Sequence, residues 1–530
     1  MKVVFFIWSL LIKTLRLMKY TLLQTGCLTM GCFTLTPLAF AATEDRPNIL
    51  FIMSDDHTSQ AVSAYHSILA DVAPTPNIDR LANEGALMEN CFVTNSISTP
   101  SRGAIITGQY SQKNHVYTLA DQLDPGHPNV AKYLQAAGYQ TAMVGKWHLH
   151  AEPTGFDWYN VLPGQGRYHN PELIEKGMWG NNPRLPAKNK KVYPGHSTDI
   201  IAGQALNFIK NRNPSKPFFL MCHFKAPHRN WICADRFKDK WKDTKMPMPA
   251  NLLDTYVGKG QYADSLRLRM EDLTPTDVKR PIPAGMTRDE QREWAYQFYI
   301  KDYLRCVAGV DENVGKILDY LDENGLTKNT VVIYTGDQGF FLGEHGWFDK
   351  RLMYEECLRA PFLIRYPKEI KAGTVNKDIV LNIDYAPLFL DYAGIAKPSQ
   401  MQGESFRTNV EGCTPANWRK AMYYRYWMHN DPSHHVMANY GIRTQRYKLV
   451  YYYGKNLKKS GARSDWNIPA EWELYDLKTD PNEMHNLYTD PANKSLINEL
   501  KMKLIELKKQ YGDEDDQYPV MRQMADQYYW

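Results

Sequence analysis

The sequence predicts an α/β fold, in which helices sandwich a mixed, mostly parallel sheet, followed by a smaller α+β domain. Over residues 45–410 of the 530-residue chain, short apolar segments alternate with helix-like segments, which is typical of an α/β sandwich. Four of these segments are largely continuous apolar runs, as expected for strands that are buried on both faces. Over residues 415–530 the pattern changes to closely spaced strands and one helix, which predicts a separate C-terminal domain.

The predicted elements of the larger domain are four strands, two long helices and two long loops. The strands cover residues 49–53, 141–144, 218–221 and 331–334. The helices cover 199–210 and 294–323, and the second ends at Asn324-Gly325, which suits a helix C-cap. The loops cover 168–194 and 246–285, and loops of this length often shape a binding pocket.

The C-terminal domain is predicted to contain a four-stranded antiparallel sheet and a helix. Its strands cover residues 423–427, 440–444, 448–453 and 472–477. The helix, over 493–511, would have one apolar face, made of Leu496, Leu500, Leu504, Leu507 and Tyr511. The remaining residues form a tail rich in aromatic side chains.

Residues 1–42 are predicted to be a signal peptide. Basic residues precede an apolar stretch over 20–40 that ends in an Ala-x-Ala cleavage pattern. We therefore expect an exported protein, periplasmic or at the cell surface. Met18 is an alternative start, and Cys27 leaves lipoprotein anchoring open as a weaker alternative. Beyond residue 42 no apolar run is long enough to predict a membrane span.

The composition excludes some classes of function. The net charge is only +5 and no long basic block is present, so a nucleic-acid partner is not predicted. The six cysteines beyond the signal peptide match no metal-knuckle spacing, and both disulfides and free thiols remain open. The sequence does not indicate an oligomeric state.

Polar residues that carry chemistry follow each predicted core strand. Asp55-Asp56 follow the first, Lys146 and His148 the second, Lys225 and His228 the third, and Asp337-Gln338 the fourth. In parallel sheets ligands bind beyond the carboxyl ends of the strands, so these residues are predicted to meet at one edge. The three aspartates and Gln338 offer oxygen donors that suit Ca²⁺ or Mg²⁺.

The segment from Ser98 to Gly108 is predicted to begin a helix at an anion site. Pro100 fits the first turn, which places Ser98 at the positive end of the helix with free N–H groups. Arg102 lies one turn along and would neutralise a nearby negative charge. Taken by itself, this segment is better explained by an ordinary capped helix.

Together these residues carry a family resemblance. The segment Ser98-Thr99-Pro100-Ser101-Arg102 with Thr107-Gly108 resembles the sulfatase signature. Further matching motifs are Asp55-Asp56, Gly145-Lys146-Trp147-His148, Ala226-Pro227-His228, Gly336-Asp337-Gln338-Gly339 and Phe348-Asp349-Lys350. Over residues 46–480 the chain is thus similar to the type I, formylglycine-dependent sulfatases of the alkaline phosphatase superfamily.

This resemblance implies an alkaline-phosphatase-like fold and a set of site residues. Ser98 would be converted to Cα-formylglycine, whose hydrate supplies the nucleophile, and would ligate Ca²⁺ or Mg²⁺ together with Asp55, Asp56, Asp337 and Gln338. The implied roles of the remaining residues are charge stabilisation by Arg102, Lys146 and Lys350, protonation of the leaving oxygen by His228, and orientation or deprotonation of the hydrate by His148.

The sequence departs from the family pattern at three positions. Ser98 stands where many relatives have Cys, so maturation would need a converting enzyme that accepts serine. Gln338 replaces a frequent Asn, which keeps the amide oxygen, and Gln109 replaces a frequent Arg.

The loops carry a finer resemblance, to N-acetylglucosamine-6-sulfatases and mucin-desulfating sulfatases. It lies in 155–171, which includes Leu162-Pro163-Gly164-Gln165-Gly166, and in 225–231. The implied substrate is 6-O-sulfated N-acetylglucosamine of heparan-type or mucin-type glycans, and the candidate binding residues are Gln165, His169, Asn170 and His435. Iduronate-2-sulfatase and arylsulfatase remain alternatives, as do a phosphoester or phosphonate hydrolase of the same superfamily and a glycan-binding protein with a decayed site.

Overall fold

The computed structural model describes residues 46–180, 190–465 and 468–529, and residues 45–530 cluster as one compact unit. The predicted signal peptide lies outside the described residues, and the predicted domain boundary near 410–415 stays a prediction. Among the described residues no helix is both long and apolar enough to cross a membrane.

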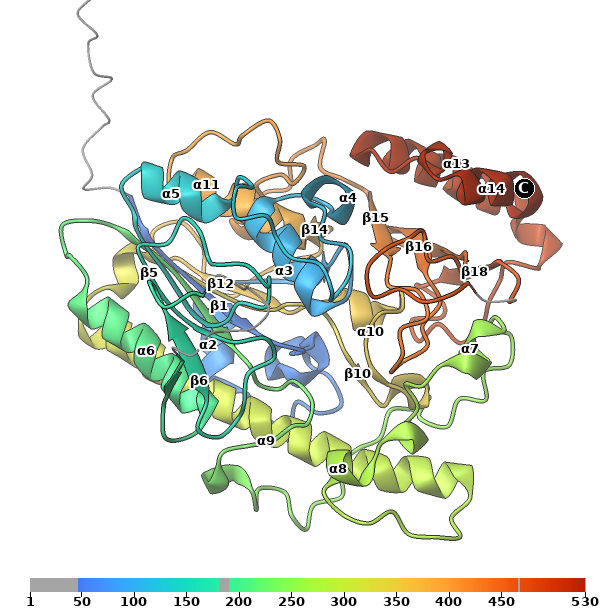
Figure 1. Ribbon diagram of the computed structural model, residues 1–530, viewed down its shortest axis with the longest axis horizontal. Helices are drawn as coiled ribbons and strands as arrows, with labels where there is room; N and C mark the ends of the chain where they lie inside the picture. Colours follow the sequence, from blue (N-terminus) through green and yellow to red (C-terminus); the bar gives the residue numbers. More distant parts are fainter. Residues whose placement is uncertain (1–45, 181–189, 466–467, 530) are drawn as a thin grey trace, which may run out of the picture. The chain divides into compact units, whose positions relative to one another are not determined.

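A ten-stranded mixed sheet forms the centre of this unit (Figure 1). Its strands, in spatial order, are β13 (Thr374–Asn376), β2 (Ala86–Met88), β12 (Phe362–Arg365), β9 (Thr330–Gly336), β1 (Asn48–Ser54), β8 (Phe218–Phe224), β4 (Gln140–Lys146), β5 (Trp158–Leu162), β6 (Glu172–Glu175) and β7 (Lys191–Val192). The four predicted core strands are β1, β4, β8 and β9. They lie next to one another and pair in parallel.

Helices cover both faces of the sheet, which explains why its strands are apolar throughout. Leu50 and Ile52 of β1 pack in a cluster with α6 (Ser197–Asn211) and α9 (Arg288–Glu323). Ile49 and Phe51 point to the opposite face, into a cluster with α5 (Val130–Ala136) and α11 (Tyr385–Tyr392). Figure 1 shows these two helix layers on either side of the strands. Burial on both faces removes the polar alternation of a half-exposed strand.

The predicted helices are confirmed with longer bounds. The first is α6, and the second is α9, which begins earlier than predicted because Thr287 and Glu290 form a capping box. It ends at the predicted position, where Asn324 is the C-cap and Gly325 adopts a positive φ of 66°.

The two long loops were predicted only in part correctly. The range 168–194 contains β6 and β7, which extend the sheet edge, and 246–285 contains the short helices α7 (Tyr262–Ser265) and α8 (Pro275–Val278). These short elements lie in polar segments without a periodic apolar pattern, so the sequence does not predict them. Contacts with the rest of the fold stabilise them instead.

The C-terminal part contains the predicted antiparallel sheet and helix. The strands are β15 (Ala421–Tyr426), β16 (Asn439–Thr444), β17 (Tyr447–Tyr452) and β18 (Glu471–Asp476), in that spatial order. Helix α13 (Lys494–Tyr511) buries Leu500, Leu504 and Tyr511, with Leu496 and Leu507 partly buried beside them. The predicted tail contains a further helix, α14 (Pro519–Tyr528).

The remaining helices are α2 (Pro76–Asn83), α3 (Ser98–Thr107), α4 (Ser111–Asn114), α10 (Glu355–Leu358) and α12 (Arg407–Val410). Two short strand pairs complete the described part, β3 (Cys91–Phe92) with β14 (Val380–Leu381), and β10 (Phe341–Leu342) with β11 (Phe348–Asp349). All six cysteines in the described ranges are free thiols.

Candidate active site

The register of two neighbouring strands brings the predicted metal acids together. Strands β1 and β9 pair in parallel, with Ser54 opposite Gly336, so Asp55-Asp56 and Asp337-Gln338 leave the sheet side by side. The Asp337 N–H donates to the Ser54 carbonyl at 3.2 Å, and the Asp56 N–H donates to Asp337 Oδ1 at 3.0 Å. The sequence therefore predicted this juxtaposition correctly.

The geometry and charge of these residues fit a divalent cation. The side chains of Asp55, Asp56, Asp337 and Gln338 are fully buried, and Asp56 Oδ2 and Gln338 Oε1 have no hydrogen-bond partner in the described part of the chain. Burial, reinforced by the neighbouring carboxylates, raises the pKa of Asp56 to about 7 and that of Asp337 to about 6. A cation among these oxygens would relieve both the repulsion and the missing contacts. Asp55, Asp56 and His228 alone place their ligand atoms within 4.8 Å of one another.

Helix α3 delivers Ser98 to this cluster. The helix begins at Ser98, as predicted, and ends where Gly108 adopts a positive φ of 66°. The Ser98 hydroxyl donates to Asp55 Oδ1 at 3.1 Å, so its oxygen lies beside the predicted metal ligands. One turn on, Ser101 donates to the Asp337 carbonyl, which ties the start of the helix to the end of β9.

Three cations surround the acids. Arg102 contacts two of them, since its Nη2 also lies 3.5 Å from Asp55 Oδ1. Arg102 donates to Asp337 Oδ2 from Nε at 3.0 Å and lies 2.9 Å from the same oxygen through Nη2. The Lys146 ammonium contacts Asp55, and the Lys350 ammonium contacts Asp56. Although burial alone would raise it, Lys146 and the other nearby cations hold the pKa of Asp55 well below its usual range.

Two predicted histidines border the same cluster. His228 Nε2 lies 3.8 Å from Asp56 Oδ2, and His228 Nδ1 lies 2.7 Å from the Arg229 carbonyl oxygen. His148 is buried, its Nδ1 has no partner among the described residues, and its ring centroid lies 5.1 Å from that of His150. Burial, followed by the charge of Lys146, lowers the pKa of both His148 and His228 well below the usual value.

The predicted substrate-binding residues lie at different places. Gln165 reaches the centre, where its Oε1 accepts a hydrogen bond from Lys146 Nζ at 2.6 Å. His169 and Asn170 instead join their loop to the segment before α6. His169 pairs with His196, and Asn170 Oδ1 accepts from the Gly195 N–H at 3.0 Å. His435 donates its backbone N–H to the Asp431 carbonyl at 3.0 Å.

A network around Asp349 was missed from the sequence. His434 Nε2 lies 3.5 Å from Asp349 Oδ2 and His434 Nδ1 lies 2.8 Å from Asp431 Oδ1, while Arg351 Nε donates to Asp349 Oδ1 at 3.2 Å. Burial opposes ionisation of Asp349, but His434, Arg351 and Lys350 hold its pKa well below the usual range. Asp349 could have been found from the motif Phe348-Asp349-Lys350, because it directly precedes the predicted site residue Lys350.

His223 was also missed, because it lies inside the apolar run of β8. Its Nδ1 lies 3.2 Å from the Lys146 carbonyl oxygen and 3.5 Å from Arg102 Nη1. Arg102 Nη1 itself donates to the Lys146 carbonyl at 2.5 Å. His223 thus packs where the ends of β4 and β8 meet the Arg102 side chain. Nothing in the sequence pattern distinguishes it from a core residue.

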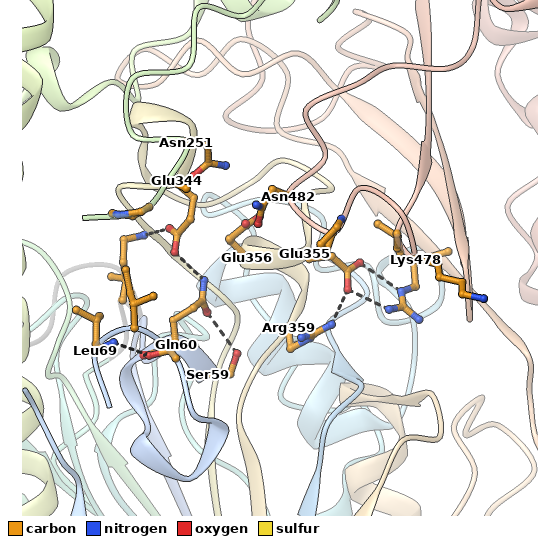
Figure 2. Close-up of a pocket in the computed structure, with 18 of the residues that line it drawn as sticks. Ser59, Gln60, Leu69, Asn251, Glu344, Glu355, Glu356, Arg359, Lys478 and Asn482 are labelled. Atoms are coloured by element: carbon orange, nitrogen blue, oxygen red, sulfur yellow. Dashed lines mark hydrogen bonds and ion pairs between the residues drawn. The ribbon is translucent and has the colours of Figure 1, made fainter. Parts of the chain in front are cut away.

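Two cavities can be compared with the predicted site, and only the smaller one borders it. A cavity of about 370 Å³ borders the predicted centre and is lined by His148, Trp147, Leu162, Pro163 and Gly164, among others. A larger one, of about 690 Å³, is shown in Figure 2; there Glu355 accepts hydrogen bonds from Arg443 and Arg359, and Gln60 donates to Glu344. None of the predicted site residues lines this larger cavity.

The fold and the site define the class of protein, and the comparisons with known proteins agree. The arrangement is that of the alkaline phosphatase superfamily. The sulfatase family model matches residues 47–395, and a model of the C-terminal region of N-sulphoglucosamine sulphohydrolase matches 343–510. The chain belongs to the sulfatase family, the sulfuric ester hydrolases that use a metal and formylglycine.

Individual relatives are similar over most of the chain. It is 42% identical to an N-acetylglucosamine-6-O-sulfatase of Bacteroides thetaiotaomicron, covering 89% of this chain and 88% of that protein. It is 26% identical to human N-acetylglucosamine-6-sulfatase, covering 76% and 70%. A protein solved in complex with its substrate, D-glucosamine-2-N,6-O-disulfate, superposes with a TM-score of 0.79 at 42% identity, covering 89% of this chain and 99% of that one.

Proposed function

We propose that this sulfatase hydrolyses the 6-O-sulfate ester of N-acetylglucosamine in heparan-type or mucin-type glycans. The chemistry is carried by one observation: three buried carboxylates, Ser98 and three cations from separate segments meet at one sheet edge. The substrate assignment is supported by the 42% identity to a relative named N-acetylglucosamine-6-O-sulfatase. The relative solved with D-glucosamine-2-N,6-O-disulfate supports the same position on the sugar.

We assign the metal to Asp55, Asp56, Asp337, Gln338 and the oxygen of residue 98. All five donors are oxygens, which suits Ca²⁺, with Mg²⁺ as the alternative. The Ser98 Oγ stands in for an oxygen of the formylglycine hydrate, which a serine-type converting enzyme would generate. When present, the metal would neutralise charge on the sulfuryl oxygens and the hydrate would supply the nucleophilic oxygen.

The protein's own residues bind and orient the ester. Arg102, Lys146 and Lys350 would hold the sulfuryl oxygens and stabilise the charge that develops on them. His148 would orient the hydrate or accept its proton, and His228 would protonate the leaving oxygen. His228 must carry a proton for this role. Burial lowers its pKa in the free protein, whereas an adjacent sulfuryl anion favours its charged form.

One of the two cations that could bind a uronate carboxylate is already engaged, which supports a neutral sugar as the substrate. A uronate carboxylate calls for a matching cation, for which the sequence offers Arg167 and Arg229. Arg229 is already bound by Asp277, with Nε donating to Oδ1 at 2.7 Å and Nη2 to Oδ2 at 2.6 Å. We propose instead that Gln165 and the His434–Asp349 pair hydrogen-bond sugar hydroxyls, because they border Lys146 and Lys350.

A phosphoester or phosphonate hydrolase is the runner-up. A phosphonate monoester hydrolase from Silicibacter pomeroyi superposes with a TM-score of 0.68, but at 19% identity this likeness shows the fold alone. A two-zinc design would need additional histidine ligands, and among the described residues the acid cluster includes only His228.

The deciding experiment measures sulfate release from a panel of defined substrates. The protein is matured with a serine-type converting enzyme, and Ser98→Ala serves as the blank. We expect a higher kcat/KM for N-acetylglucosamine 6-sulfate than for a 2-O-sulfated uronate, an aryl sulfate or a matched phosphate ester. A preference for the uronate would overturn the substrate assignment but leave the sulfatase activity intact. A preference for the phosphate ester would favour a phosphoester hydrolase.

We also infer export. The support is the N-terminal pattern over 1–42, with its basic residues, apolar stretch and Ala-x-Ala site. Fractionation of the native host, with detection of a mature start near Thr43, tests it. A chain that keeps residues 1–42 in the cytoplasm would contradict the inference.

A further inference from the structure

One buried lysine at the edge of the site, Lys225, has no acidic partner among the residues that the structure describes. Lys225 directly follows β8 and is 4% exposed. Arg102, Lys146 and Lys350 each contact a carboxylate of the metal cluster. Within the described ranges, by contrast, no carboxylate oxygen lies within 4.0 Å of the Lys225 ammonium. A buried charge without a partner is unfavourable, so a ligand that supplies the missing negative charge would be stabilised there.

The position of Lys225 is fixed on the side of the site that carries His228. Its Nζ lies 4.7 Å from the centroid of the Tyr168 ring. The Tyr168 hydroxyl donates to the His228 carbonyl oxygen, so one aromatic ring connects the lysine with the histidine. A cation over an aromatic ring keeps its charge at modest cost while its remaining N–H groups stay available.

The electrostatic surroundings agree with a charged lysine close to the reacting centre. Burial lowers the pKa of Lys225 to about 8, and Lys146 adds to this effect while Asp55 and Asp56 oppose it. At neutral pH the group is therefore still mainly cationic. The register of the sheet supplies the geometry: Ser54 of β1 pairs with Phe224 of β8, and the Asp55 N–H donates to the Phe224 carbonyl at 3.2 Å. Lys225 therefore leaves the same sheet edge as Asp55, among the groups that would surround a sulfuryl group.

We propose that Lys225 is a further substrate-binding residue, whose ammonium contacts the sulfuryl oxygens of the bound ester and of the inorganic sulfate product. The inference rests on the proposed function and deepens it. Lys225 would be a fourth cation at the site. The other three, Arg102, Lys146 and Lys350, already contact the predicted metal-binding aspartates. The inference also predicts that part of the affinity for sulfate depends on a residue outside the sulfatase signature.

The test compares product inhibition by a charged and a neutral product. Inorganic sulfate and N-acetylglucosamine are titrated against hydrolysis of N-acetylglucosamine 6-sulfate by wild type, Lys225→Met and Lys225→Arg. We expect Lys225→Met to raise the inhibition constant of sulfate about 10- to 100-fold, the range for loss of a charge-assisted hydrogen bond, and to raise KM similarly. The inhibition constant of N-acetylglucosamine should stay within about twofold, and Lys225→Arg should recover most of the sulfate affinity.

Controls separate contact from indirect effects. Lys316→Met removes an exposed lysine with the same change in net charge and should leave sulfate inhibition unchanged. If Lys225→Met does not fold at the assay temperature, Lys225→Gln replaces it. An unchanged inhibition constant for sulfate would overturn the proposal. So would equal weakening of both products, because Lys225 would then act through Tyr168. A wild type that releases no sulfate would instead refute the proposed function itself.

Discussion

Metal binding should displace protons from the acid cluster, so metal affinity should rise steeply with pH. In the metal-free protein burial raises the pKa of Asp56 to about 7 and that of Asp337 to about 6. A proton on either carboxyl competes with the metal, because a coordinating carboxylate must be ionised. Asp55 should not contribute, since nearby cations hold its pKa well below the usual range.

The size of the effect follows from these two pKa values. The apparent dissociation constant rises by a factor of one plus ten to the power of pKa minus pH for each carboxyl. Between pH 8 and pH 5.5, Asp56 weakens binding about 30-fold and Asp337 about 4-fold. Together they give about 100-fold, or about 2.7 kcal/mol. The sign is fixed because proton and metal compete for the same carboxylates, so affinity falls as the pH falls. The raised pKa values of Asp56 and Asp337 place this loss between about pH 7.5 and 5.5.

Calorimetric titration measures the pH dependence of metal affinity directly. Protein from which metal has been removed with a chelator is titrated with Ca²⁺ and, separately, with Mg²⁺. Titrations at pH 5.5, 7 and 8, in two buffers of different ionisation enthalpy, give both the affinity and the number of protons released. Asp56→Asn should bind more weakly and lose most of the pH dependence. Asp55→Asn should bind more weakly and shift the pH dependence to lower pH, because the Asp55 charge helps to raise the pKa of Asp56 and of Asp337. An affinity that changes less than about threefold over this range, without proton release, would refute the assignment of these carboxylates to the metal.

Three further predictions concern catalysis. Peptide mass spectrometry of active protein should show an aldehyde at position 98, and Ser98→Ala should abolish sulfate release; full activity with unmodified Ser98 would contradict the assignment. His228→Ala should reduce turnover of a sugar sulfate far more than that of an aryl sulfate, because a sugar alkoxide leaves poorly without a proton, and equal losses would indicate positioning. His434→Ala should raise KM for N-acetylglucosamine 6-sulfate about tenfold, as expected for one lost hydrogen bond of 1–3 kcal/mol, with His435→Ala as its neighbouring control. A larger rise in KM for His435→Ala than for His434→Ala would instead assign the sugar contact to His435.

The catalytic edge was predictable because its residues follow strands with a strong sequence signal. Strands β1, β4, β8 and β9 are continuous apolar runs, since both faces of the sheet are covered by helices. Parallel strands end at the same edge, so Asp55-Asp56 and Asp337-Gln338 had to meet once β1 and β9 were neighbours. The start of α3 at Ser98 was also local information, given by Pro100 in its first turn.

The rim of the site was not predictable in the same way. His434 rather than His435 reaches Asp349, a contact between residues 85 positions apart that depends on how a loop of the C-terminal sheet packs. Asn170 was predicted to bind sugar, yet its side chain is bonded to the Gly195 N–H. No periodicity sets such contacts, because they depend on the backbone path of two loops at once.

The sequence by itself determined the family, the four core strands and the residues at their carboxyl ends, because burial and short motifs leave local patterns. Only the tertiary structure decided how the charges pair: Arg102 with Asp337, Lys146 with Asp55, Lys350 with Asp56, and Lys225 with no acid among the described residues. Pairing depends on distances of a few ångströms between side chains far apart in the chain. Spacing along a sequence does not encode such distances, and burial makes them energetically decisive.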